Sequence, residues 1–205
     1  ELIICQSTSQ PSNTNHTCPT CARHGINGGE IVPKSMMQYM VSLQDGHGNH
    51  LCGGFLVIGS KILKKGFHET YISYFSLIFC LQLQKNVKGD NAKNAEIPNS
   101  EIDLKVNQQC VVAGWGPEDC EKGPVKDLRM VNVSVFNCPH NVTDICTSET
   151  GFCEIDAGGP LVCDEKAVGV VIFDKKLNRA TISNISTKHV WIKDKINNPS
   201  WKDCW

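Results

Sequence analysis

Short apolar runs separated by turn-forming residues dominate the sequence from residue 39 onward. The runs are rich in Val and Ile, and clusters of Gly, Asn and Asp such as 45–49 (DGHGN) lie between them. Runs of this length and composition predict β-strands, and their spacing predicts a barrel or a sandwich. The clearest runs lie at 39–44, 51–58, 110–115, 130–136 and 167–173.

The two ends of the chain depart from this pattern. Residues 1–25 are mostly polar and lack hydrophobic periodicity, so we expect a flexible N-terminal extension. Near the other end, 187–196 (TKHVWIKDKI) carries apolar residues on one side at helical spacing, and Pro199 follows. This predicts a helix over about 188–197.

Composition and charge exclude some partners. A chain of 205 residues with 40% hydrophobic residues can bury a substantial core. Its formal net charge of -1 gives no reason to expect a nucleic-acid partner. The longest apolar run, around 74–83, is about half the length of a membrane span and contains Gln82, so we expect no span.

Twelve cysteines and four Asn-x-Ser/Thr sequons favour an oxidising, secretory compartment. We expect an extracellular or secretory-granule protein. A cytosolic protein with many free thiols is the less favoured alternative. One sequon, at Asn132, falls in a predicted strand, so Asn15, Asn141 and Asn184 are the better candidates for glycosylation.

Cys18 and Cys21 form a C-x-x-C pair flanked by His16 and His24. Such a pair is compatible with a zinc knuckle or a redox pair, but zinc fingers need a second pair at a matching spacing. No such pair occurs, so we expect no metal and no other cofactor. The pair is interpreted as part of a propeptide-like extension.

Several stretches resemble the trypsin-like serine proteases and occur in the same order as in that family. Their sequences are most similar to the granzyme and mast-cell-protease branch. The similarity covers roughly residues 26–196. It rests on 26–30 (INGGE), 39–44 (YMVSLQ), 51–57 (LCGGFLV), 81–87 (LQLQKNV), 110–116 (CVVAGWG) and 156–163 (DAGGPLVC).

The resemblance implies an all-β fold of two packed antiparallel six-stranded-type barrels, the first one shortened, with a C-terminal helix. The implied protease domain is 26–205. Within it, barrel one covers about 26–107, barrel two about 108–187 and the helix about 188–197.

Peptide hydrolysis in this family needs a serine nucleophile, a histidine base and an aspartate that orients the histidine. The position that matches the nucleophile is Ala157, although its neighbours Asp156, Gly158 and Gly159 match the family. The orienting carboxylate falls at Leu77. The histidine block is missing, because 51–58 leads directly into sequence that resembles a later part of the barrel. His68, the nearest candidate there, matches a surface loop, so we expect no catalytic triad.

The surroundings of the nucleophile position also depart from the family. Ile155 replaces the glycine of the oxyanion loop, which predicts a distorted oxyanion hole. Ile26 matches the new N-terminus that pairs with Asp156 after activation, but His24 and Gly25 precede it where a cleavable residue is usual. At the specificity pocket, Gly151 stands at the base, and the substrate-pairing segment reads Ile172, Phe173 and Asp174.

The resemblance implies two disulfides, Cys110 with Cys163 and Cys138 with Cys146. Eight other cysteines are left without an assigned partner. Among these, a bridge between Cys52 and Cys80 is a speculative new pairing, because both would lie in the shortened first barrel.

Three functional hypotheses remain open. The leading one is a secreted protease homologue that does not hydrolyse peptides and acts by binding substrates, inhibitors or receptors of its active relatives. The second is a serine endopeptidase represented by a truncated or altered sequence. The third is a decayed gene product that folds poorly, since losing barrel strands exposes sheet edges and apolar surface.

Overall fold

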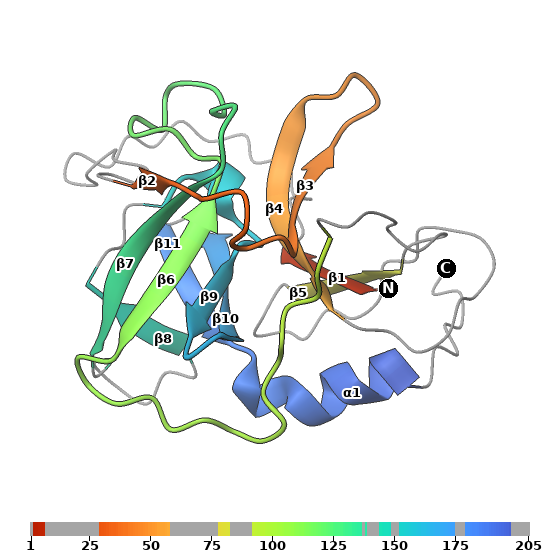
Figure 1. The fold of residues 1–205 in the computed structure, drawn as a ribbon, viewed down its shortest axis with the longest axis vertical. Coiled ribbons are helices and arrows are strands. Elements are labelled where there is room, and N and C mark those ends of the chain that lie inside the picture. Colours follow the sequence, from red (N-terminus) through yellow and green to blue (C-terminus); the bar gives the residue numbers. More distant parts are fainter. Residues whose placement is uncertain are drawn as a thin grey trace.

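The computed structural model describes two lobes that lie side by side, with a helix beneath them (Figure 1). The described residues are 2–6, 29–57, 78–82, 92–136, 138, 144–148, 152–174 and 179–197.

The larger lobe is a closed antiparallel barrel. Its strands follow the order β7-β6-β9-β10-β11-β8, and pairing between β7 and β8 closes the circle. The short strand β2 (Glu30–Ile31) adds to the outer edge of β7. The six barrel strands are β6 (Gln109–Gly114), β7 (Arg129–Phe136), β8 (Asp144–Thr147), β9 (Pro160–Cys163), β10 (Lys166–Asp174) and β11 (Arg179–Asn184).

The interior of this barrel is filled by the branched side chains that the strand pattern directs inward. Val112, Leu161 and Val168 are fully buried there, and Ile182 nearly so. In β7 the buried residues Val133 and Val135 alternate with more exposed ones, as the two-residue period of a strand requires. Strand β8 pairs with the end of β7 at Val135 and Phe136, and β2 pairs with its beginning at Arg129 and Met130.

The smaller lobe is a four-stranded sheet in the described part of the chain. Its order is β3 (Met40–Gln44), β4 (His50–Val57), β1 (Leu2–Gln6) and β5 (Ile78–Gln82), and no pairing joins β3 to β5. The lobe therefore contains fewer described strands than a closed six-stranded barrel.

Strand β1 departs from the flexible extension expected over 1–25. The apolar, β-branched segment around Ile3 and Ile4 pairs with both β4 and β5. Because this segment is short and lies in an otherwise polar region, the sequence pattern did not predict a strand there. The rest of the extension, including Cys18 and Cys21, lies outside the described residues.

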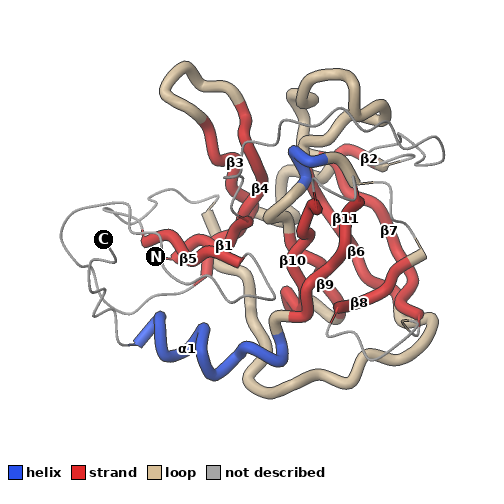
Figure 2. The backbone as a smooth tube through the Cα atoms, turned by 180° about the vertical axis from the view of Figure 1, so that it is seen from behind, coloured by secondary structure: helices blue, strands red, loops and turns tan. Residues whose placement is uncertain are grey.

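The two lobes share a buried cluster in which Phe55 and Val57 of β4 meet Val170 of β10. The 3₁₀ turn η2 (Ser186–Lys188) leads into α1 (His189–Asn197), whose Ile192 packs into the same cluster. Figure 2 shows the helix running from barrel two along the side of the smaller sheet. The predicted fold class is confirmed: two packed antiparallel β lobes, the first one shortened, with a C-terminal helix.

Candidate functional site

The loop that matches the protease nucleophile lies between the two lobes. It starts with the 3₁₀ turn η1 (Glu154–Asp156), passes through Ala157 and two glycines, and enters β9. Gly158 has φ +88°, a conformation that residues with a Cβ rarely adopt. Its N–H donates to the Val171 carbonyl over 2.8 Å, which ties the loop to β10.

Ala157 is buried, with 1% of its surface exposed. Its N–H donates to the Glu154 carbonyl over 3.1 Å, which closes the 3₁₀ turn. Its carbonyl accepts a hydrogen bond from the Gly53 N–H over 2.9 Å and so links the loop to β4. The methyl side chain offers no nucleophile, and the N–H that would face an oxyanion is already bonded within the loop.

Asp156 is completely buried beside this loop. One carboxylate oxygen accepts the Gly116 N–H over 2.7 Å, and the other accepts the Cys153 N–H over 2.9 Å. Burial raises the pKa of this carboxyl to about 6, and the two backbone hydrogen bonds oppose that rise. The carboxylate thus has local backbone donors in the described structure, while Ile26 lies outside it.

Two glycines make the space that Asp156 fills. A Cβ added to Gly114 or to Gly116 would collide with the carboxylate. The segment 114–116 therefore needs glycine at both ends to let the loop and β6 approach closely. This close approach explains why a glycine lies on each side of Trp115.

His50 is a polar residue of this region that the sequence analysis passed over. Its Nδ1 lies 2.7 Å from the Ser42 hydroxyl oxygen, and its Nε2 lies 3.0 Å from the Ile155 carbonyl oxygen. The ring also packs against Trp115 at a centroid distance of 5.3 Å. Both ring nitrogens already have partners, so the histidine connects the β3–β4 hairpin to the loop. A histidine next to a turn carries no signal of this role in the sequence.

Other residues singled out from the sequence are not brought together at the loop. Phe173 packs against the core of barrel two, Ile172 packs against the cluster between the lobes, and Asp174 is exposed at the end of β10. Four of the positions singled out at the expected protease site lie outside the described residues: Ile26, His68, Leu77 and Gly151.

The described residues form three disulfides. The two pairs implied by the resemblance, Cys110–Cys163 and Cys138–Cys146, are both present. The third joins Cys120 to Cys153 across a sequence separation of 33. Both cysteines were among the eight that the sequence left without an assigned partner.

The suggested bridge from Cys52 to Cys80 is not formed: Cys52 is a buried free thiol, whose pKa burial raises to about 11. Strand β1 separates β4 from β5, so the strands that carry these cysteines lie about 10 Å apart. A disulfide requires its two Cα atoms to be within about 7 Å.

Two sequons can be examined in the structure, and their order differs from the expectation. Asn132 is exposed on β7, because its place in the strand directs it out of the barrel. Asn184 is only partly exposed, and its side-chain oxygen accepts hydrogen bonds from the Ser186 N–H and hydroxyl over 2.9 and 2.7 Å. Asn15 and Asn141 lie outside the described residues.

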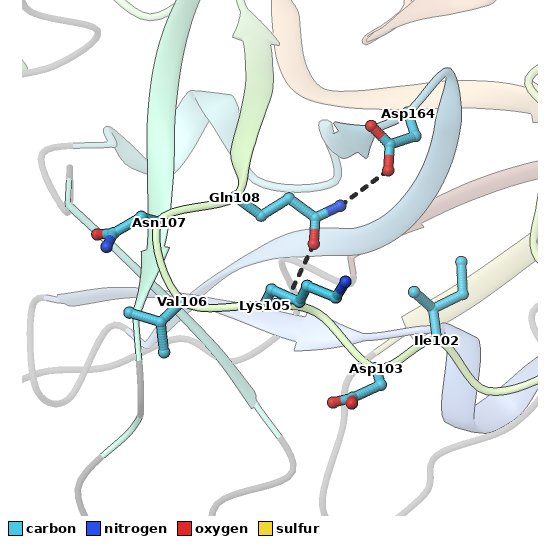
Figure 3. Close-up of a pocket in the computed structure, with 7 residues that line it drawn as sticks. All are labelled: Ile102, Asp103, Lys105, Val106, Asn107, Gln108 and Asp164. Carbon is cyan, nitrogen blue, oxygen red and sulfur yellow. Dashed lines mark hydrogen bonds between the residues drawn. The ribbon is translucent and has the colours of Figure 1, made fainter.

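A hollow in the described surface lies away from the nucleophile loop (Figure 3). It has a volume of about 430 Å³ and is shallow and open to solvent. At its centre, the Gln108 side chain donates to Asp164 and accepts from the Lys105 N–H, each over 3.0 Å. Ala157 precedes β9 and Asp164 follows it, so this hollow is separate from the nucleophile loop.

Within the described ranges, no helix is long and apolar enough to cross a membrane. In the same part of the chain, no group of three or more His, Cys, Asp and Glu side chains is arranged to hold a metal ion.

Comparison with known proteins agrees with this geometry. The family model described as Trypsin matches residues 64–196, which is more than half of the chain. The chain belongs to the trypsin family. Mouse granzyme E is 27% identical over 218 residues, covering 80% of this chain and 87% of the relative. Granzyme-like protein 2 of the rat is 29% identical over 222 residues, covering 78% and 86%.

A solved structure of human heparin binding protein has the same fold. It superposes with a TM-score of 0.71 at 21% identity, covering 87% of this chain and 100% of the other. At this level of identity the similarity concerns the fold alone.

Proposed function

We propose that this trypsin-family chain does not hydrolyse peptides and acts by binding other proteins in an extracellular or secretory-granule setting. The observation that carries the proposal is Ala157. It occupies the nucleophile position without a hydroxyl, and its N–H donates to Glu154. The position thus lacks the attacking group, and its own N–H is not free to bind an oxyanion.

The missing histidine block adds support. The alignment with mouse granzyme E runs over 218 positions, more than the 205 residues of this chain, so the relative must have residues that this chain lacks. The described histidine that contacts the loop, His50, has Ser42 and the Ile155 carbonyl as the partners of its two ring nitrogens. A serine placed at Ala157 would therefore lack a base within the described part of the site.

The proposed partners are proteins that active relatives engage, which are protease substrates, inhibitors or receptors. The three disulfides of the described residues favour an oxidising compartment. Nothing in the charge balance suggests a nucleic-acid partner, since the formal net charge is -1.

A serine-directed fluorophosphonate probe tests the absence of hydrolysis. The purified, oxidised chain is treated with the probe beside an active trypsin-family endopeptidase, and covalent labelling is measured by intact mass. We expect labelling of the active enzyme only. Covalent modification of this chain at any residue would contradict the proposal. A cooperative thermal transition of the same sample would count against a poorly folding product.

Replacing Ala157 with serine gives a sharper prediction. We expect Ala157→Ser to remain unlabelled and to hydrolyse peptide esters at the rate of the unchanged chain, because a hydroxyl without a base and an oxyanion hole is a weak nucleophile. Ester hydrolysis is followed by absorbance, with buffer alone as the background. A gain of even 10²-fold would show that a base and an oxyanion donor are available after all.

A further inference from the structure

The position of strand β1 in the smaller sheet does not follow from its position in the sequence. It lies between β4 and β5 and pairs antiparallel with both (Figure 1). The next strand along the chain, β2, belongs to the other sheet, and 22 residues, 7–28, separate β1 from Gly29. Consecutive strands usually pair with each other. Strand β1 instead pairs with two strands that do not follow it directly in the sequence.

The edge of β4 that faces β1 can be identified from printed hydrogen bonds. The Leu56 N–H donates to Tyr39, and the Leu56 carbonyl accepts from Ala95, each over 2.8 Å. Both groups therefore point away from β1. Successive residues of a strand direct their backbone groups to opposite edges, so Phe55 and Val57 direct theirs toward β1.

The register agrees with this assignment. Ile4 lies opposite Phe55, and Leu2 lies opposite Val57. Both residues of β4 are completely buried. Without a strand beside them, their N–H and C=O groups would be buried without partners, which is costly.

Strand β5 forms the other side of the same gap. It pairs with β1 over five residues, from Leu2 opposite Gln82 to Gln6 opposite Ile78. Since neighbouring strands lie about 4.8 Å apart, β4 and β5 are about 10 Å apart. The gap has the width of one strand, and both of its sides offer backbone hydrogen bonds.

We propose that the gap between β4 and β5 is a strand-binding site, and that residues 2–6 are its tethered, exchangeable occupant. The ligand it takes is an extended peptide of five residues, apolar and β-branched at its centre, that runs antiparallel to both neighbours. This site is distinct from the nucleophile loop and does not depend on the absence of hydrolysis. Because β1 belongs to the same chain as the site, its binding is intramolecular, so a free peptide competes only when the local strand is weakened or released.

The first test weakens the local strand in the full chain. Ile4→Pro removes a backbone N–H from the centre of β1 and disrupts its ladder. The probe is a fluorescein-labelled peptide with the sequence of residues 1–6, carrying Cys5→Ser and a lysine tail. We expect fluorescence anisotropy to show at least tenfold tighter binding to the Ile4→Pro chain than to the unchanged chain. The matched control is the same peptide with proline at the position of Ile4, which should not bind.

The proposal is overturned if the Ile4→Pro chain retains its three described disulfides and a cooperative thermal transition but does not bind the peptide. A second measurement covers the case in which this variant does not fold. A specific protease site is placed within 7–28 of a full chain carrying Cys5→Ser, which folds before it is cut.

After cleavage, native mass spectrometry follows the exchange of the N-terminal fragment for the labelled peptide. We expect exchange in the cut chain and none in the uncut chain. Loss of the fragment without uptake of peptide, or a complete lack of exchange, would overturn the proposal. If the chain exchanges the peptide and also reacts with the fluorophosphonate, the strand-binding proposal is supported and only the proposed function is contradicted.

Discussion

At the residue scale, the buried carboxyl of Asp156 links the stability of the nucleophile loop to pH. Its pKa in the fold is about 6, above the value of about 3.9 in an unfolded chain. The fold therefore favours the protonated form. This contribution to stability is fully present below about pH 4 and is lost as the pH rises through about 6.

We expect the free energy of unfolding to fall by about 2–3 kcal/mol from Asp156 alone between pH 4 and pH 7. Urea unfolding of the unchanged chain and of Asp156→Asn over this range measures it, because the difference between the two chains isolates this carboxyl. The variant has no titrating group there and should lack this slope. Parallel pH profiles for the two chains would show that the carboxyl is not shifted.

Gly116 gives a second prediction at this scale. A Cβ there would collide with the Asp156 carboxylate, whereas nothing lies within 4 Å of a Cβ added to Gly123. We expect Gly116→Ala to destabilise the fold by about 1–3 kcal/mol, as overpacked sites do, and Gly123→Ala to change it by less than about 0.5 kcal/mol. Chemical denaturation of both variants measures the difference. Equal effects would mean that the space around Asp156 is not tightly filled.

At the element scale, the disulfide between Cys120 and Cys153 joins the loop after β6 to the start of η1. Its sequence separation is 33, whereas that of Cys138–Cys146 is 8. A longer closed loop restricts the unfolded chain more. We expect paired replacement of Cys120 and Cys153 by alanine to cost about 4 kcal/mol, and paired replacement of Cys138 and Cys146 about 2.5 kcal/mol.

Urea unfolding under oxidising conditions measures both pairs. Peptide mapping of the unchanged chain first checks the connectivity. A free thiol at Cys120 or Cys153 in that map would remove the basis of the prediction, and a larger loss from the short loop would contradict the loop-length argument.

Three strands of barrel two, β6, β7 and β10, could be predicted from the sequence because short runs rich in Val and Ile mark them locally. The run expected at 130–136 became β7 at Arg129–Phe136, and the helix expected over 188–197 became η2 followed by α1 at His189–Asn197. The Cys120–Cys153 pair could not be predicted, since it depends on how two distant loops pack. The same holds for His50, whose two partners come from Ser42 and from the distant Ile155.

At the scale of the whole molecule, the two lobes differ in how their strands are closed and cross-linked. Barrel two is closed, and Cys110–Cys163 links two of its strands, β6 and β9. The described first lobe is an open sheet whose central strand, β1, comes from a distant part of the chain. Its pairing with β4 and β5 is what the sequence could not reveal, because a five-residue apolar segment in a polar region predicts neither a strand nor its neighbours.

We therefore expect the first lobe to open at a lower free energy than barrel two. Hydrogen exchange followed by mass spectrometry should show amides of β1 and β5 exchanging at least tenfold faster than those of β6 and β10, because open sheets and their edges open locally while closed barrels open with the whole domain. The exchange rates of peptides from β4 should fall between those of the two groups, since Phe55 and Val57 also belong to the cluster shared with barrel two. Uniform exchange across both lobes would show that the shared cluster couples them into one cooperative unit.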